Sequence, residues 1–214
     1  MVRMLEIITL AILILSIVLH EVAHGYAANW LGDPTARLAG RLSANPLPHI
    51  DPVGSVLIPA LLYIMHAPFL FGWAKPVPYN PYNLRNQKWG ESMVAAAGPL
   101  ANLFLATIFA VLIRCSDVLN FTETFTEMLG YVVFINVLLA LFNAIPFPPL
   151  DGSKIITPFL PFGLETRYRA LARYMENLGF VALFLCVFIF MQILWKPFSA
   201  LVSFIYHFLM TFPG

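Results

Sequence analysis

The chain has 214 residues, of which 60% are hydrophobic and only 11% are charged, and its mean hydropathy is +0.80. This composition excludes an ordinary soluble domain and predicts a polytopic integral membrane protein. The 12 basic and 11 acidic residues almost cancel, so the net charge gives no reason to expect a nucleic-acid partner. Cys115 and Cys186 are far apart, which indicates neither a disulfide framework nor a cysteine-based zinc site.

Five apolar segments approach the roughly 20 residues that a transmembrane helix requires. They cover residues 4–30, 52–71, 92–114, 127–147 and 179–212. The last is too long for one straight span and contains Lys196-Pro197, so it is either one kinked helix or a pair of helices. Because the connecting segments are short, the sequence predicts an all-α membrane helix bundle that forms one domain over residues 1–214.

The first apolar segment ends in the polar cluster HEVAH, residues 20–24. On a helix, His20 and His24 lie one turn apart on the same face, so both imidazoles can bind one metal ion. Glu21 lies beside that face, where its carboxylate can take a proton from a metal-bound water. Chance matches to this motif occur in soluble helices, but a charged group in a membrane helix costs on the order of 2.5 to 3.5 kcal/mol. The cluster therefore indicates a metal site that needs a third protein ligand.

Asp151 is the best candidate for this third ligand. It closes the stretch FNAIPFPPLDG, in which three prolines end the fourth apolar segment and Gly152 frees the backbone. Two histidines and one carboxylate with an open fourth position form a known catalytic zinc set. Taken alone, PPLDG is more typical of an ordinary helix-ending turn, so the residues themselves leave both interpretations open.

Three motifs together resemble the site-2 protease family of intramembrane zinc metalloproteases, in its compact prokaryotic branch. They are HEVAH in the first helix, AAAGPLAN in the middle helix over 92–114, and NAIPFPPLDG at the end of the segment over 127–152. The similarity extends over most of the chain between them, including GDPTARLAGRLSANPLPHIDPVG and FGWAKPVP. The combination is far more specific than any single motif.

The resemblance implies a single intramembrane protease domain with one zinc ion per chain. The metal ligands that it implies are His20, His24 and Asp151. It makes Glu21 the general base and acid, and it implies that Asn143 helps to hold the substrate carbonyl or its oxyanion. Asn102 faces the same region by analogy, although a hydrogen bond that packs two helices explains an asparagine there equally well.

The implied activity is hydrolysis of peptide bonds within or near transmembrane segments, with a transmembrane or signal-peptide-like protein as substrate and the lipid bilayer as surroundings. Two alternatives belong to other classes. A non-catalytic homologue that binds membrane proteins would be expected to lack Glu21 or a ligand, and none is missing. A zinc transporter would need a polar path through several helices, whereas the segments after residue 92 carry only scattered asparagines and a few terminal charges.

The zinc hypothesis requires the ends of the first and fourth apolar segments to lie at the same membrane face. One intervening segment should therefore not cross, and residues 52–71, with Gly54, Pro59 and Pro68, are predicted to be re-entrant. Most basic residues then fall on one side, so the positive-inside rule predicts an active site that opens toward the cytoplasm. A topology in which every segment spans also gives a fair charge bias, so whether residues 52–71 span or are re-entrant stays open.

Two segments are candidates for main-chain pairing with an unwound substrate. Residues 35–42 alternate weakly and predict a short hairpin that dips toward the site, and AKPVPYNP is extended. Prolines beside an edge strand can also be merely protective, so this interpretation stays open.

Overall fold

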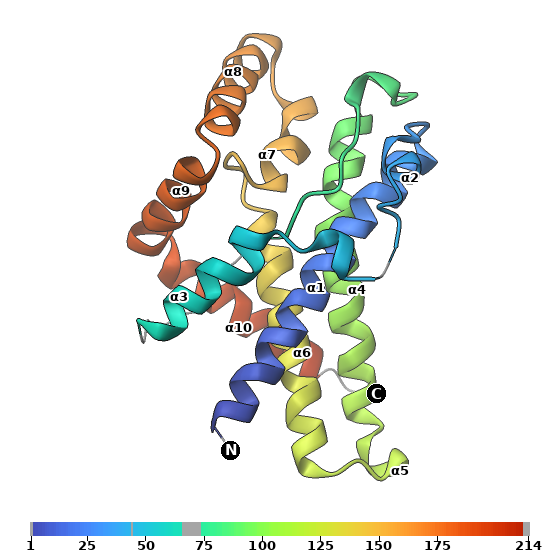
Figure 1. The fold of residues 1–214 in the computed structure, drawn as a ribbon, viewed down its shortest axis with the longest axis vertical. Coiled ribbons are helices and arrows are strands. Elements are labelled where there is room, and N and C mark those ends of the chain that lie inside the picture. Colours follow the sequence, from blue (N-terminus) through green and yellow to red (C-terminus); the bar gives the residue numbers. More distant parts are fainter. Residues whose placement is uncertain (1, 44, 66–73, 212–214) are drawn as a thin grey trace.

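The computed structural model of the protein describes residues 2–43, 45–65 and 74–211 (Figure 1). Within these ranges it contains helices and no strand, which confirms the all-α prediction. The α-helices are α1 (Val2–Trp30), α2 (Thr35–Leu38), α3 (Ile58–Ile64), α4 (Gly90–Arg114), α5 (Ser116–Leu119), α6 (Glu123–Asn143), α7 (Asp151–Ile156), α8 (Phe162–Leu178), α9 (Phe180–Ile193) and α10 (Trp195–Thr211). Short 3-10 helices cover Leu47–His49, Pro81–Asn83 and Thr157–Phe159, and a π-helix covers Pro52–Leu57.

Three of the described helices are long and apolar enough to cross a membrane: α1 from Ile8 onward, α4 and α6. Figure 1 shows that α1 and α6 run in the same direction and that α4 runs in the opposite direction. The carboxyl ends of α1 and α6 therefore lie at the same end of the bundle, as a metal site shared by His20 and Asp151 requires.

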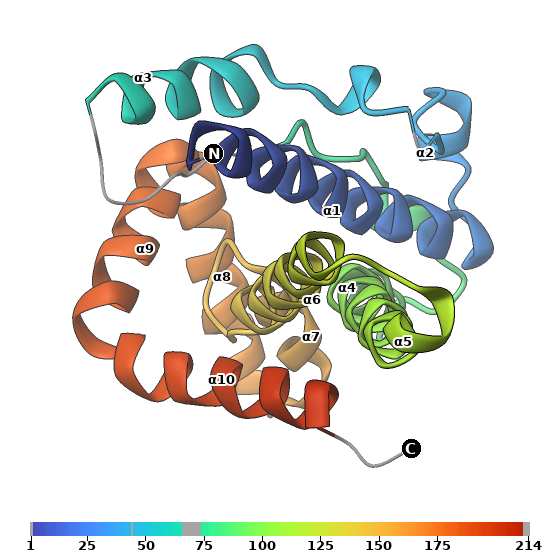
Figure 2. The same cartoon turned by 90° about the horizontal axis from the view of Figure 1, so that it is seen from below.

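The connection between α1 and α4 leaves and returns at that same end. The backbone N–H of Arg85 donates a hydrogen bond to the carbonyl of Leu31 at 2.9 Å. The described part of the predicted re-entrant segment is the π-helix and α3, which together cover Pro52–Ile64 and are too short to span. In Figure 2, α3 lies across the direction in which α4 and α6 are seen end-on. Insertion of residues 52–71 into the bilayer stays a prediction, and residues 66–71 lie outside the described ranges.

The hairpin predicted over residues 35–42 is wrong, because α2 and a turn occupy this position. The N–H groups of Leu38 and Ala39 donate to the carbonyls of Pro34 and Thr35, at 2.9 and 3.0 Å. Gly40 then ends the helix at a φ of +65°. Local helical hydrogen bonds outweigh a weak two-residue alternation here, because a lone hairpin is marginally stable without a third strand.

The carboxyl-terminal apolar segment is a pair of helices, α9 and α10, separated at Leu194. Pro197 lies in the first turn of α10, where its missing N–H leaves no helical hydrogen bond unmade. α10 packs on α4 and α6, and small residues of α4 allow the close approach. The buried members of this core are Ala106, Ala110, Val133, Val137, Phe190, Phe198 and Val202.

Candidate metal centre

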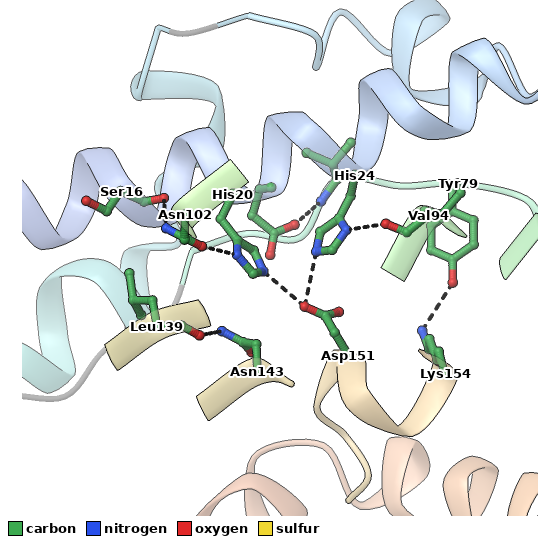
Figure 3. Close-up of polar contacts among 12 residues, drawn as sticks. Ser16, His20, His24, Tyr79, Val94, Asn102, Leu139, Asn143, Asp151 and Lys154 are labelled. Carbon is green, nitrogen blue, oxygen red and sulfur yellow. Dashed lines mark hydrogen bonds and ion pairs between the residues drawn. The ribbon is translucent and has the colours of Figure 1, made fainter. Parts of the chain in front are cut away.

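His20, His24 and Asp151 converge at the carboxyl end of α1 (Figure 3). Asp151 is the first residue of α7, and its Oδ2 atom lies 3.0 Å from Nε2 of His20 and 3.3 Å from Nε2 of His24. The ligand atoms of the three residues all lie within 4.8 Å of one another, and both imidazoles are buried. Ligands about 2.0 to 2.1 Å from a tetrahedral zinc ion are roughly 3.3 Å apart, so the arrangement fits the metal that the donor set favours.

Both imidazoles use their other nitrogen to bond to α4. Nδ1 of His24 lies 2.8 Å from the backbone carbonyl of Val94, which can only accept a hydrogen bond. Nδ1 of His20 is hydrogen-bonded to Oδ1 of Asn102. A proton on each Nδ1 satisfies these acceptors and leaves both Nε2 lone pairs for a metal, which is the usual arrangement around metal-binding histidines.

The backbone of α4 passes directly beside the imidazoles, and only glycine permits this approach. A Cβ atom at Gly98 would lie 2.5 Å from Nε2 of His24 and 2.6 Å from Nε2 of His20. The next residue, Pro99, has no N–H for the helical ladder. The GP pair of the AAAGPLAN motif therefore brings α4 against the metal-binding face of α1.

A second glycine fixes the position of Asp151. A Cβ atom at Gly152 would lie 2.2 Å and 2.3 Å from the backbone carbonyl oxygens of Ala144 and Ile145, which follow α6. Backbone atoms cannot yield as a flexible side chain can. α7 therefore packs tightly under the end of α6, and this packing directs the Asp151 carboxylate toward α1.

Glu21 follows the candidate ligand His20 on α1, and its carboxylate contacts a separate segment. Oε2 of Glu21 accepts a hydrogen bond of 2.9 Å from the backbone N–H of Val77. Val77 belongs to residues 74–83, which we call the strap. The strap precedes α4 in the chain and contacts α1 through the bond between Val77 and Glu21 (Figure 1).

The structure places the two predicted asparagines differently. Asn102 is fully buried and bonds to the candidate ligand His20. Asn143 is the last residue of α6, and its Nδ2 donates to the carbonyl of Leu139 at 3.0 Å. Catalytic roles for both asparagines stay predictions.

Two residues of this region were missed by sequence reasoning. Ser16 of α1 and Asn136 of α6 are buried and bonded to each other, with Nδ2 of Asn136 3.0 Å from Oγ of Ser16. The available signal was simple: Ser16 precedes His20 by four residues on the same helical face, and Asn136 is an isolated amide in an apolar run.

The fold and the site together define a helical membrane protein that carries a candidate three-residue metal centre between its long helices. A sequence model of peptidase family M50 matches residues 113–190. "Putative zinc metalloprotease YwhC" of Bacillus subtilis (strain 168) is 36% identical over 183 residues, which are 83% of this chain and 78% of that protein. The chain therefore belongs to peptidase family M50, the site-2 protease family.

More distant relatives carry the same kind of name. "Putative zinc metalloprotease Rip2" of Mycolicibacterium smegmatis (strain ATCC 700084 / mc(2)155) is 30% identical over 155 residues, which are 72% of this chain and 58% of that protein. The Rip2 protein of Mycobacterium tuberculosis (strain H37Rv) is 26% identical over 150 residues, 69% of this chain and 55% of that protein. The chain thus spans less than two thirds of the Rip2 proteins. No solved structure matches significantly. The family and the relatives' names support a membrane-bound zinc metalloprotease.

Proposed function

We propose that this protein is an intramembrane zinc metalloprotease that hydrolyses peptide bonds within or near transmembrane segments of other proteins. The observation that carries the proposal is the convergence of His20, His24 and Asp151 among membrane-length helices. These residues would hold one zinc ion. When bound, zinc would act as a Lewis acid on the scissile carbonyl and would lower the pKa of a water molecule in its open position.

Glu21 is the proposed general base and acid. Its Oε2 is held by the Val77 N–H, which orients the carboxylate while the other oxygen takes a proton from the attacking water. The same carboxylate then delivers this proton to the leaving amine nitrogen. Asn143 is proposed to turn its amide from the Leu139 carbonyl toward the oxyanion of the substrate, where one donor contributes about 2.7 to 4 kcal/mol.

A substrate helix must unwind before its peptide bond can be attacked, because its carbonyls are engaged in its own hydrogen bonds. The proposed substrates are transmembrane or signal-peptide-like proteins in the lipid bilayer. Pairing with the strap as an added strand finds little support in the contacts. The strap N–H groups of Lys75 and Val77 donate to the carbonyl of His49 and to Glu21, and the carbonyls of Lys75 and Pro76 accept from Arg41.

We further propose that the site opens toward the cytoplasm. Nine of the 12 basic residues belong to elements at the end of the bundle that carries the site, where α1 ends, α4 begins and α7 and α8 lie; they are Arg37, Arg41, Lys75, Arg85, Lys88, Lys154, Arg167, Arg169 and Arg173. Cys115 follows α4 at the opposite end and is partly exposed, whereas Cys186 is buried. An impermeant thiol reagent should label Cys115 from outside intact cells. Labelling of Cys115 only after lysis would contradict this orientation.

The test of function compares the wild type with Glu21→Gln. The glutamine can still accept from the Val77 N–H, so the site keeps its geometry but loses its base. Both purified proteins should bind one zinc ion, and only the wild type should cut transmembrane peptides in a chelator-sensitive manner. Equal cleavage by both proteins would refute Glu21 as the base, and absence of zinc from the wild type would refute the metal site.

A further inference from the structure

A buried chain of polar groups leads from His20 through three helices. Asn102 of α4 bonds to Nδ1 of His20, and its Nδ2 donates to Oδ1 of Asn136 on α6 at 2.7 Å. Nδ2 of Asn136 in turn donates to Oγ of Ser16 on α1 at 3.0 Å. Both asparagines are completely buried, and Ser16 is 4% exposed. Figure 3 shows the Asn102 side chain between His20 and Ser16, with Nδ2 of Asn102 3.5 Å from the backbone carbonyl of Ser16.

Asn136 sets which groups donate and which accept along this series of hydrogen bonds. A side-chain amide can place either its oxygen or its nitrogen toward a neighbour, so each asparagine alone could face either way. Asn136, however, also donates from Nδ2 to the backbone carbonyl of Val132 at 2.9 Å, and a carbonyl can only accept. Its Oδ1 must then face Nδ2 of Asn102, and the Oδ1 of Asn102 faces His20. Nδ2 of Asn102 also lies 3.5 Å from the backbone carbonyl of Ser16, at the outer limit of a hydrogen bond, so the 2.7 Å bond to Asn136 is the stronger constraint on the orientation of this amide.

We propose that Asn136 is a positioning residue that selects the metal-binding tautomer of His20 by fixing the amide orientation of Asn102. An oxygen at Nδ1 holds the imidazole proton there and keeps the Nε2 lone pair for a metal. If Asn102 turned its NH2 group toward His20, Nδ1 would become the acceptor and Nε2 would carry the proton. The inference rests on the proposed metal site, because the tautomer of His20 affects zinc binding only if His20 is a metal ligand.

A simpler explanation is that the asparagines only join helices. Amide hydrogen bonds between membrane helices contribute to association, and α4 and α6 pack closely in this region. The two explanations differ in one respect. If the bond between Asn102 and Asn136 only packs helices, its loss cannot be repaired by a change at position 102. If the bond selects the tautomer of His20, any side chain at position 102 that offers His20 an acceptor should be sufficient.

The experiment therefore compares three variants with the wild type: Asn136→Leu, Asn102→Asp and the double variant. Asn136→Leu frees the Asn102 amide to turn and should weaken zinc binding about 10- to 100-fold, the range seen when partners of metal-binding histidines are lost. Asp at position 102 offers only acceptors to His20, so its orientation no longer depends on Asn136. The double variant should recover at least about tenfold in zinc affinity relative to Asn136→Leu, although it has lost more of the native hydrogen bonds.

Zinc affinity is measured by competition with a chromophoric chelator in detergent, and thermal unfolding of the metal-free proteins reports packing separately. Thr107→Val is the control, because the Thr107 hydroxyl is exposed and donates to the Leu103 carbonyl of its own helix, α4. Should Asn136→Leu not fold, Asn136→Ala replaces it in both backgrounds. Unchanged zinc affinity in Asn136→Leu, or no recovery in the double variant, would overturn the inference. A wild type without zinc would instead refute the metal site itself.

Discussion

Val77 donates its backbone N–H to Oε2 of Glu21 at 2.9 Å, so the HEVAH motif is completed by a residue 56 positions later in the chain. The contact is asymmetric, since it engages one carboxylate oxygen. A hydrogen bond to a charged group contributes about 1.5 to 3 kcal/mol when it is fully formed. The strap therefore belongs to the proposed catalytic machinery, although it carries none of the metal ligands.

Replacing Val77 by proline removes this N–H and is expected to lower kcat roughly tenfold to a hundredfold, following the energy of a charged hydrogen bond. Zinc content should not change, because Glu21 is not a ligand. Val77→Ala is the matched control: it removes the buried side chain but keeps the N–H, and it should retain most of the activity. Peptide cleavage and bound zinc are measured for both variants. A loss of cleavage as large in Val77→Ala as in Val77→Pro would mean that packing, and not the hydrogen bond, is what matters.

Arg41 holds the strap in place through the backbone carbonyls of the two residues before Val77. Its guanidinium donates to the carbonyls of Lys75 at 2.8 Å and Pro76 at 3.3 Å, and it also bonds to the carbonyl of Pro48. Its side chain is 8% exposed, so water cannot replace these bonds easily. A lysine offers a single point of contact in place of this planar fork.

Arg41→Met should therefore remove three charge-assisted hydrogen bonds, worth about 1.5 to 3 kcal/mol each when fully formed, and shift the Val77 N–H away from Glu21. We expect cleavage to fall at least about tenfold while zinc stays bound, and Arg41→Lys to restore only part of it. Arg37→Met serves as the control, since Arg37 lies in α2 and is exposed. If both methionine variants lost the same activity, the effect would come from general surface charge.

Gly98→Ala should abolish high-affinity metal binding without unfolding the bundle. The added methyl group would lie within 2.6 Å of Nε2 of both histidines, so the imidazoles must move apart or rotate. A loss of at least about tenfold in zinc affinity is expected, by analogy with other disturbances around metal-binding histidines. Gly163→Ala on α8 meets open space and should leave the affinity unchanged. Titration with a chelator measures both, and full zinc affinity in Gly98→Ala would show that the histidines bind in another arrangement.

The sequence predicts the long helices well because the bilayer requires long apolar segments. The expected middle helix over 92–114 is found as Gly90–Arg114, and the first as Val2–Trp30. The break near Lys196-Pro197 could be located, but not resolved into a kink or a pair, because a proline is compatible with both. The connection between α1 and α4 was the least predictable part. Its conformation depends on contacts of Arg41 and Glu21 with backbone groups far along the chain.

In the candidate site, too, the residues with a local sequence pattern could be predicted and those that depend on contacts between helices could not. His20 and His24 are recognisable because helical geometry brings positions four apart together, and Asp151 because a carboxylate after three prolines is unusual in an apolar chain. The structure brings these three together. Ser16 and Asn136 have no local motif, and their significance depends on which helices adjoin, which hydropathy does not determine.

Asp33 anchors the far end of the strap, and its contribution should depend on pH. Its buried carboxylate accepts hydrogen bonds from the N–H of Asn80 at 2.6 Å, from Asn83 at 2.8 Å and from Thr35. Burial alone would raise the pKa of Asp33, but these hydrogen bonds outweigh it and lower the pKa. A released Asp33 has an ordinary pKa near 3.9, so the anchoring is complete above that value and weakens as the pH falls toward the lowered pKa.

Hydrogen exchange of strap amides, corrected for intrinsic rates, should show falling protection below about pH 4 in the wild type. Asp33→Asn should show weaker protection at neutral pH and little of this pH dependence. Asp51→Asn is the control and should behave as the wild type, because it removes the charge of a carboxylate that caps the π-helix at Val53 and Gly54 and, among the described residues, makes no hydrogen bond to the strap. An equal pH dependence in Asp33→Asn would assign the titration to another carboxylate.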